Sequence, residues 1–193
     1  METNKTLIVP IGISGSGKST YFNKRLLIDF PKIAERLNEL NLSVADIVVC
    51  PDEIRKEILG SVNDQTNGSM IWKIAGERVH GKLHKIGLAI IDGVNTHGGG
   101  RNKFLKNYKN TKKIALIFRP KIDLCFERIT NDISNNVDRS NVPLEAIQRQ
   151  LKSFKSSVIR DEKWDGLWNN SIKEKITKNL MEEKRFHEVR FID

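Results

Sequence analysis

The sequence has few of the residues that define several common protein classes. Among its 193 residues are two cysteines, Cys50 and Cys125. These are too few for a disulfide-rich scaffold, so we expect both to be reduced core residues of a cytoplasmic protein. No run of about 18 apolar residues is present, which argues against a membrane-spanning helix. The first ten residues lack the basic and then apolar pattern of a signal peptide. The length favours a single domain over residues 1–193.

Acidic residues are missing from one long stretch of the chain. Between Asp92 and Asp123 there is no Asp or Glu. The whole chain has 33 Lys and Arg residues against 24 Asp and Glu residues, a formal net charge of +9. This balance favours a polyanionic partner such as nucleic acid. The alternative is a lysine-rich composition without a bound polyanion. The basic residues of the acid-free stretch are Arg101, Lys103, Lys106, Lys109, Lys112, Lys113, Arg119 and Lys121.

Short β-branched runs alternate with helical stretches. This alternation predicts an α/β fold with a mostly parallel central sheet flanked by helices. The glycines at 98–100 are expected to form a loop. The expected strands cover residues 7–13, 46–50, 88–91, 114–118 and 189–192. The expected helices cover residues 18–29, 31–40, 53–59, 70–86, 102–108, 122–133, 143–158 and 171–183.

A glycine-rich motif follows the first expected strand. Residues 12–19 match the pattern G-x-x-x-x-G-K-[ST]. Glycines let backbone N–H groups approach phosphate oxygens closely, and the following helix presents its positive end to the same anion. Lys18 is expected to neutralise the β- and γ-phosphates of ATP, and Ser19 to coordinate Mg²⁺. The predicted ATP-binding residues of this loop are Gly12, Ser14, Gly15, Ser16, Gly17, Lys18, Ser19 and Thr20.

A carboxylate ends the third expected strand. Residues 88–91 are apolar and are followed by Asp92, the pattern of a Walker B element. At the carboxyl end of a strand beside the phosphate loop, Asp92 is expected to hold Mg²⁺ or to orient the substrate. The alternative is that Asp92 only begins an Asp-Gly turn.

Other residues favour a phosphotransferase among the P-loop proteins. The guanine-specific patterns D-x-x-G and N/T-K-x-D do not occur. Asp52 follows the second expected strand, where a general base could take the proton of an acceptor hydroxyl; it could equally cap the next helix. Arg55 lies one turn further on and could clamp a substrate phosphate. Arg139 lies in a polar segment between two helices, where a closing lid could place it over the γ-phosphate.

The combination of these motifs resembles the phage polynucleotide 5′-hydroxyl kinase family and related small P-loop kinases. The resemblance covers most of residues 7–155 and is carried by four segments: 12–19, 51–55, 91–95 and 139–143. It implies a nucleotide kinase-like P-loop NTPase fold with a helical lid over about residues 128–143. It also implies a nucleic-acid substrate, ATP and Mg²⁺ as cofactors, and a phage-infected host cell as the setting.

The resemblance also implies roles for individual residues. Lys18, Asp52 and Arg139 would be catalytic, with Asp52 as the base. Arg128 and Val142 would sandwich the adenine. Ser19 and Asp92 would hold the metal. The predicted substrate-binding residues are Arg55, Asp92, Asn95 and Arg101.

The chain departs from this family in three respects. It has no D-x-D-x-T phosphatase motif, the stretch from Arg128 to Arg139 is longer, and residues 95–101 are unusually rich in glycine. Those glycines could admit a bulky acceptor or form a surface turn. Three alternatives to a 5′-hydroxyl kinase therefore stay open: a kinase of 5-hydroxymethyl pyrimidine bases in phage DNA, a small-molecule or nucleoside kinase, and a non-catalytic ATP-dependent nucleic-acid-binding module.

The sequence leaves two further points open. Residues 160–193 could pack on the kinase domain, contribute to a dimer or touch nucleic acid. The oligomeric state is open between a monomer and a homo-oligomer.

Overall fold

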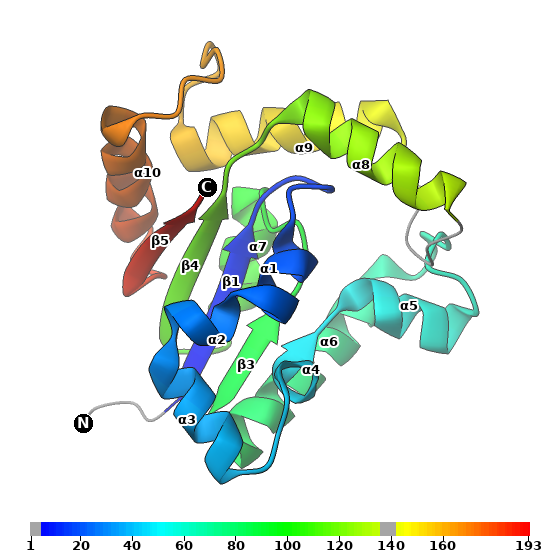
Figure 1. The fold of residues 1–193 in the computed structure, drawn as a ribbon, viewed down its shortest axis with the longest axis vertical. Helices are drawn as coiled ribbons and strands as arrows, with labels where there is room; N and C mark the ends of the chain where they lie inside the picture. The colour runs from blue at the N-terminus through cyan, green and yellow to red at the C-terminus, as the bar shows by residue number, and fades with distance from the viewer. Residues whose placement is uncertain (1–4, 136–141) are drawn as a thin grey trace.

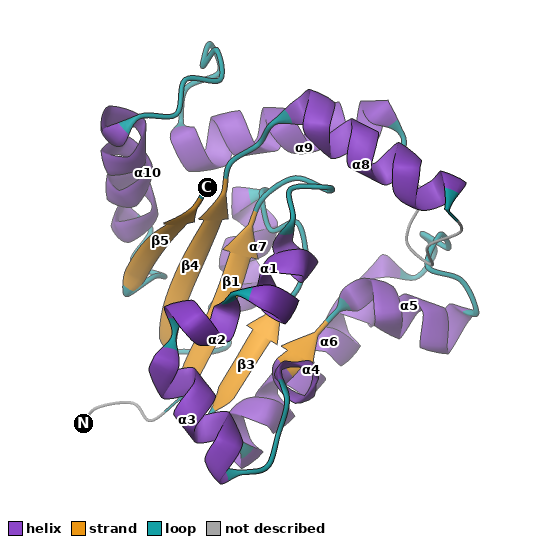
Figure 2. Ribbon diagram, in the orientation of Figure 1, coloured by secondary structure: helices purple, strands orange, loops and turns teal. Residues whose placement is uncertain are grey.

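A five-stranded parallel sheet forms the centre of the protein (Figures 1 and 2). The computed structural model describes residues 5–135 and 142–193. The strand order is β2-β3-β1-β4-β5, and every neighbouring pair is parallel. Parallel neighbours need long crossover connections, which here contain the helices. The strands are β1 (Thr6–Ile11), β2 (Val48–Val49), β3 (Leu88–Ile91), β4 (Lys112–Phe118) and β5 (Glu188–Ile192).

Helices cover both faces of the sheet. Helices α1, α2 and α3 lie on one face, and α6 and α7 lie on the other (Figure 1). Helices α8 and α9 pass across the carboxyl ends of the strands (Figure 2). The predicted α/β class is therefore confirmed. The helices are α1 (Lys18–Lys24), α2 (Leu26–Asp29), α3 (Pro31–Glu39), α4 (Val44–Ile47), α5 (Pro51–Leu59), α6 (Gly68–Lys85), α7 (Gly98–Leu105), α8 (Ile122–Ser134), α9 (Leu144–Phe154), a π-helical turn η1 (Lys155–Ile159) and α10 (Asn170–Glu182).

The core is divided by the sheet. Along β1, Leu7, Val9 and Ile11 belong to one buried hydrophobic cluster, whereas Ile8 belongs to the other. Successive side chains of a strand point to opposite faces, so one apolar run fills both layers. A smaller cluster around Ile13 packs under α8 and α9. The strand that leads into the glycine-rich loop is therefore held from both sides.

The C-terminal segment packs on the sheet. Strand β5 pairs with β4 along its whole length, and Ile176, Leu180 and Phe186 are buried in the same cluster as Leu7. None of the helices over residues 5–135 and 142–193 combines the length and apolarity that a membrane span requires.

Several of the expected elements have different bounds or a different structure. The helix over 18–29 breaks at Arg25, whose φ of −127° leaves the helical region. Residues 46 and 47 are helical because Ser43 and Asp46 form a capping box that starts α4, which leaves β2 with two residues. Residues 98–100 form the first turn of α7 rather than a loop, since His97 accepts a hydrogen bond from the N–H of Gly100. The helix expected over 143–158 changes to a π-helical turn after Phe154.

Candidate active site

The glycine-rich loop connects β1 to α1 at the carboxyl edge of the sheet. Gly15 and Gly17 have φ values of 77° and 91°, a left-handed conformation that favours glycine. A Cβ at Gly15 would collide with the carbonyl oxygen of Cys125, and a Cβ at Gly12 would lie 2.8 Å from Cβ of Phe118. The glycines of the motif are therefore required by backbone conformation and by close packing.

Lys18 folds back over this loop. Its Nζ donates hydrogen bonds to the carbonyl oxygens of Gly12 (3.1 Å) and Ile13 (2.9 Å), and the residue is 9% exposed. A buried ammonium needs compensating partners, and the two carbonyls hold this one at the centre of the loop. The sequence therefore places one cation where a phosphate chain on the loop would need it.

The loop also contains donors that suit a phosphate. The Ser16 hydroxyl is buried and has no hydrogen-bond partner among the described residues. Leaving a buried hydroxyl unpaired is costly, and a phosphate oxygen would satisfy it. Beside it, the N–H of Ser14 donates to Oε1 of Gln150 on α9 over 2.7 Å. The residues present therefore fit a nucleoside triphosphate.

Ser19 and Asp92 face each other across the site. The Ser19 hydroxyl donates to Oδ2 of Asp92 over 3.1 Å, and the N–H of Asp92 donates to the carbonyl of Val49. Burial raises the pKa of Asp92, while the Lys18 charge and the Ser19 hydrogen bond act in the opposite direction. A hydroxyl and a carboxylate are oxygen ligands that suit Mg²⁺, which characteristically shares its shell with water and phosphate. This pair fits the metal role expected for it.

Asp52 and Arg55 lie on the first turns of α5. Pro51 is at the start of this helix, which favours initiation there. The Arg55 guanidinium pairs with the Asp52 carboxylate; the Arg55 side chain is 9% exposed and that of Asp52 is 50% exposed. Nε of Arg55 is buried without a hydrogen-bond partner in the described part of the chain. The Asp52 carboxylate is therefore exposed to solvent while the ion pair with Arg55 fixes its position. The Nε–H of Arg55 is a buried donor that stays unpaired among the residues that the structure describes.

Asp52 and Asp92 lie within electrostatic reach of each other. The Asp52 charge contributes to the raised pKa of Asp92. Burial raises the pKa of Cys50, which directly follows β2, to about 11, and both carboxylates add to that shift. The structure therefore brings to one edge of the sheet two carboxylates that are far apart in the sequence.

The two residues expected around the adenine, Arg128 and Val142, both lie near α8. Arg128 Nη1 donates to the carbonyl of Gly15 over 3.2 Å, and Arg128 lines a cavity of about 530 Å³ next to the loop. Val142 packs against the cluster around Ile13, which includes Cys125 and Ile129 of α8. Arg139, the expected lid arginine, lies outside the described residues.

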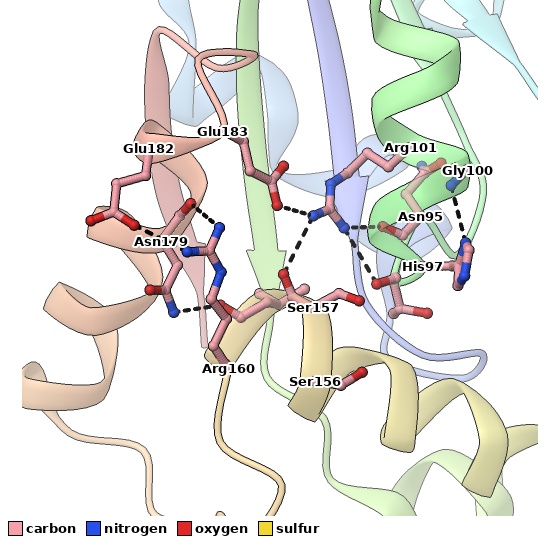
Figure 3. A network of polar contacts seen from close by, with 12 residues as sticks. Asn95, His97, Gly100, Arg101, Ser156, Ser157, Arg160, Asn179, Glu182 and Glu183 are labelled. Carbon is pink, nitrogen blue, oxygen red and sulfur yellow. Dashed lines mark hydrogen bonds and ion pairs between the residues drawn. The ribbon is translucent and has the colours of Figure 1, made fainter.

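Asn95 and Arg101 organise the segment after β3 (Figure 3). The Asn95 amide donates to the carbonyls of Pro10 (2.9 Å), Ile91 (3.1 Å) and Gly93 (3.2 Å). Arg101 donates to the carbonyl of Asn95 and forms a 2.7 Å ion pair with Glu183, which directly follows α10, with side chains 1% and 8% exposed. The Asn95 amide nitrogen and the two terminal nitrogens of Arg101 are thus engaged within the protein, whereas Nε of Arg101 is buried without a partner among the described residues. Both residues also line a cavity of about 760 Å³.

Two residues near the candidate active site, Gln150 and Trp72, had no role predicted from the sequence. Gln150 bonds to the phosphate loop from α9, and nothing in the sequence marks it. Trp72 lines the larger cavity and is 39% exposed. The sequence does contain an indication that Trp72 is exposed, because this residue falls outside the apolar stripe of the helix expected over 70–86.

The sheet, the phosphate loop and the carboxylate edge together define a P-loop protein of kinase-like α/β fold. Residues 7–157 match the AAA domain family, and the chain therefore belongs to that family. No curated protein matches the sequence.

Solved structures share the fold at low identity. A chain of the Pnkp1/Rnl/Hen1 RNA repair complex is 18% identical with a TM-score of 0.62, over 84% of this chain and 47% of its own. A chain of the AvrRxo1-ORF1:-ORF2 complex is 14% identical with a TM-score of 0.59, over 97% and 54%. A candidate kinase from Chloroflexus aurantiacus is 16% identical with a TM-score of 0.53, over 75% and 78%. This chain thus spans about half the length of the first two.

Proposed function

We propose that the protein is an ATP-dependent kinase that transfers the γ-phosphate to a hydroxyl of a nucleic acid, in particular a polynucleotide 5′-hydroxyl. The observation that carries this proposal is the meeting of a phosphate loop with two carboxylates, Asp52 and Asp92, at one edge of the sheet. A phosphotransferase needs both a donor half and an acceptor half, and each has candidate residues here.

The donor half is the loop with Lys18 and Ser19. Backbone N–H groups and the Ser16 hydroxyl would bind the phosphates, and Lys18 would neutralise charge that develops on the transferring group. Ser19 and Asp92 would hold Mg²⁺, which supplies charge neutralisation across the β- and γ-phosphates when it is bound. Arg128 already contacts the loop at Gly15 and would contact the nucleotide from α8. Arg139 is proposed as a second cation at the transferring phosphate.

The acceptor half is the start of α5. As the acceptor oxygen bonds to the γ-phosphorus, the bond to the bridging oxygen of ADP breaks, and Asp52 takes the proton of the hydroxyl. Arg55 would hold that carboxylate in place through its ion pair and would contact the acceptor through the exposed part of its guanidinium. The role of the pair is thus to orient the oxygen and to remove its proton.

The net charge of +9 supports a polyanionic acceptor. The fold shared with a chain from an RNA repair complex is consistent with the same choice. The test is to incubate the protein with γ-labelled ATP and a panel of acceptors: 5′-hydroxyl DNA, 5′-hydroxyl RNA, 5-hydroxymethylated DNA and free nucleosides. Label at the 5′ ends of oligonucleotides supports the proposal. Label on a modified base or a nucleoside, or no transfer to any oligonucleotide, contradicts it.

A further inference from the structure

A cavity of about 760 Å³ lies between α6, α7 and α9, beside the loop that follows β3. Ligand sites commonly occupy roughly 300–1,000 Å³, so this one could hold a segment of a large substrate. Figure 1 shows α6 and α7 on the face of the sheet opposite α1, α2 and α3. The cavity is thus distinct from the one beside Arg128, where the nucleotide is proposed to bind.

Two walls of this cavity touch the candidate active site. On one side, Gln150 accepts the hydrogen bond from the N–H of Ser14 in the phosphate loop. On the other, the ring of Trp72 lies against Gly93, where a Cβ would be 3.5 Å from the indole. Gly93 directly follows Asp92. The cavity therefore adjoins both the phosphate loop and the carboxylate edge.

An aromatic platform lines the cavity. Trp72 packs edge-to-face on Phe104 with ring centroids 5.5 Å apart, and Phe104 packs on Tyr108 at 5.3 Å. These contacts fix the orientation of the indole, yet Trp72 is 39% exposed. A rigid and partly exposed indole is suited to stacking against a flat ring.

The charged side chains that line this cavity are all positive. Lys73, Lys103 and Arg149 line the cavity and are exposed, and no Asp or Glu is among its described lining residues. Within residues 5–135 and 142–193 these three cations form no ion pair. Cations that surround an aromatic ring match the phosphates and the base of a nucleotide strand.

We propose that this cavity binds the acceptor as a single strand, with one base stacked on Trp72 and the neighbouring phosphates against Lys73, Lys103 and Arg149. The proposal rests on the proposed kinase function, because it assigns the path of the acceptor. A single strand is required because the base must offer a free face to the indole, whereas the bases of a duplex are already stacked on one another.

The experiment uses the full chain and a labelled single-stranded oligonucleotide with a 5′-hydroxyl. Equilibrium binding without ATP and the KM for the oligonucleotide in phosphate transfer are measured in parallel. Trp72→Ala is expected to weaken binding and raise this KM by about 5- to 150-fold, the range that loss of one base–aromatic stack gives. Trp72→Phe is expected to recover most of the loss. Thermal melting of both variants checks that they fold.

Salt dependence separates stacking from charge. Lys73→Gln should reduce the slope of log affinity against log salt by about 0.7, the value for one phosphate contact on a single strand. Trp72→Ala should weaken binding while leaving that slope unchanged. Lys32→Gln on α3, an exposed lysine on the other face, is the matched control and should change neither quantity.

The outcomes separate this proposal from the proposed function. Transfer to oligonucleotides that is insensitive to Trp72→Ala overturns the strand cavity and leaves the kinase intact. Binding that depends on Trp72, without any transfer, supports a strand site and overturns the kinase. Equal Trp72-dependent binding of an acidic polypeptide such as poly-glutamate overturns recognition of a nucleotide strand.

Discussion

The Ser19 hydroxyl donates a hydrogen bond to Oδ2 of Asp92 over 3.1 Å, which joins the first turn of α1 to the end of β3. Asp92 is partly buried, and burial raises its pKa despite the Lys18 charge. In the absence of bound ligand, the charged form of Asp92 is therefore a cost to the fold. Such a cost is expected of a residue kept for binding or chemistry.

Replacing Asp92 by Asn should therefore stabilise the nucleotide-free protein at neutral pH. The pKa of Asp92 is higher in the folded state than in the unfolded state. Between these two pKa values the folded state binds more protons than the unfolded state, so the free energy of unfolding falls as the pH rises through that range. The melting temperature of Asp92→Asn should exceed that of the wild type at pH 7, by about 2–4 °C for each kcal/mol, with the difference shrinking toward pH 4. Thermal scans across this range measure it, and a lower melting temperature at pH 7 would contradict it.

The contact between Gly15 and Cys125 gives a second prediction. Gly15→Ala would place a Cβ against the Cys125 carbonyl at a residue with a φ of 77°, and a left-handed non-glycine residue adds strain of about 1–3 kcal/mol. We expect lower stability and loss of ATP binding, measured by melting and by nucleotide titration. Gly68→Ala is the control, because a Cβ there meets nothing within 4 Å. Equal effects of the two substitutions would count against a rigid loop.

The buried Arg101–Glu183 ion pair gives a third prediction (Figure 3). Glu183→Gln would leave the Arg101 guanidinium buried without a counter-charge, which should cost about 3–5 kcal/mol in the free energy of unfolding. Glu182→Gln removes the exposed pair with Arg160, whose side chains are 42% and 50% exposed, and should cost less than about 1 kcal/mol. Denaturant unfolding of both variants compares them, and similar losses would show that α10 is not anchored by this pair.

Local sequence signals were enough for the sheet and the phosphate loop. The apolar run of β3 and the glycine spacing between Gly12 and Gly17 depend on short-range rules, and both structures formed where these rules placed them. Residues 98–100 show where these short-range rules fail. Three glycines favour a loop, but the imidazole of His97 caps a helix there, and Arg101 of that helix is fixed by Glu183, 82 residues away.

Long-range contacts account for what the sequence did not indicate at the site. Gln150 reaches Ser14 across 136 residues, and a lone glutamine on a helix carries no sign of that contact. Arg101 was predicted to bind substrate, and nothing in the sequence indicated the buried ion pair that it forms with Glu183. Asp52 and Asp92 could be placed at one edge because parallel strands end at the same side of a sheet.

The central claim is that Asp52 is the base that activates an acceptor hydroxyl. Asp52→Asn keeps the size of the side chain and removes its ability to take a proton. The most direct measurement is the rate of phosphate transfer from ATP to a 5′-hydroxyl oligonucleotide by this variant, with ATP affinity measured alongside. Loss of a general base typically costs about 10²- to 10⁴-fold. We predict a fall of that size in kcat with unchanged ATP affinity; transfer at the wild-type rate would contradict the assignment.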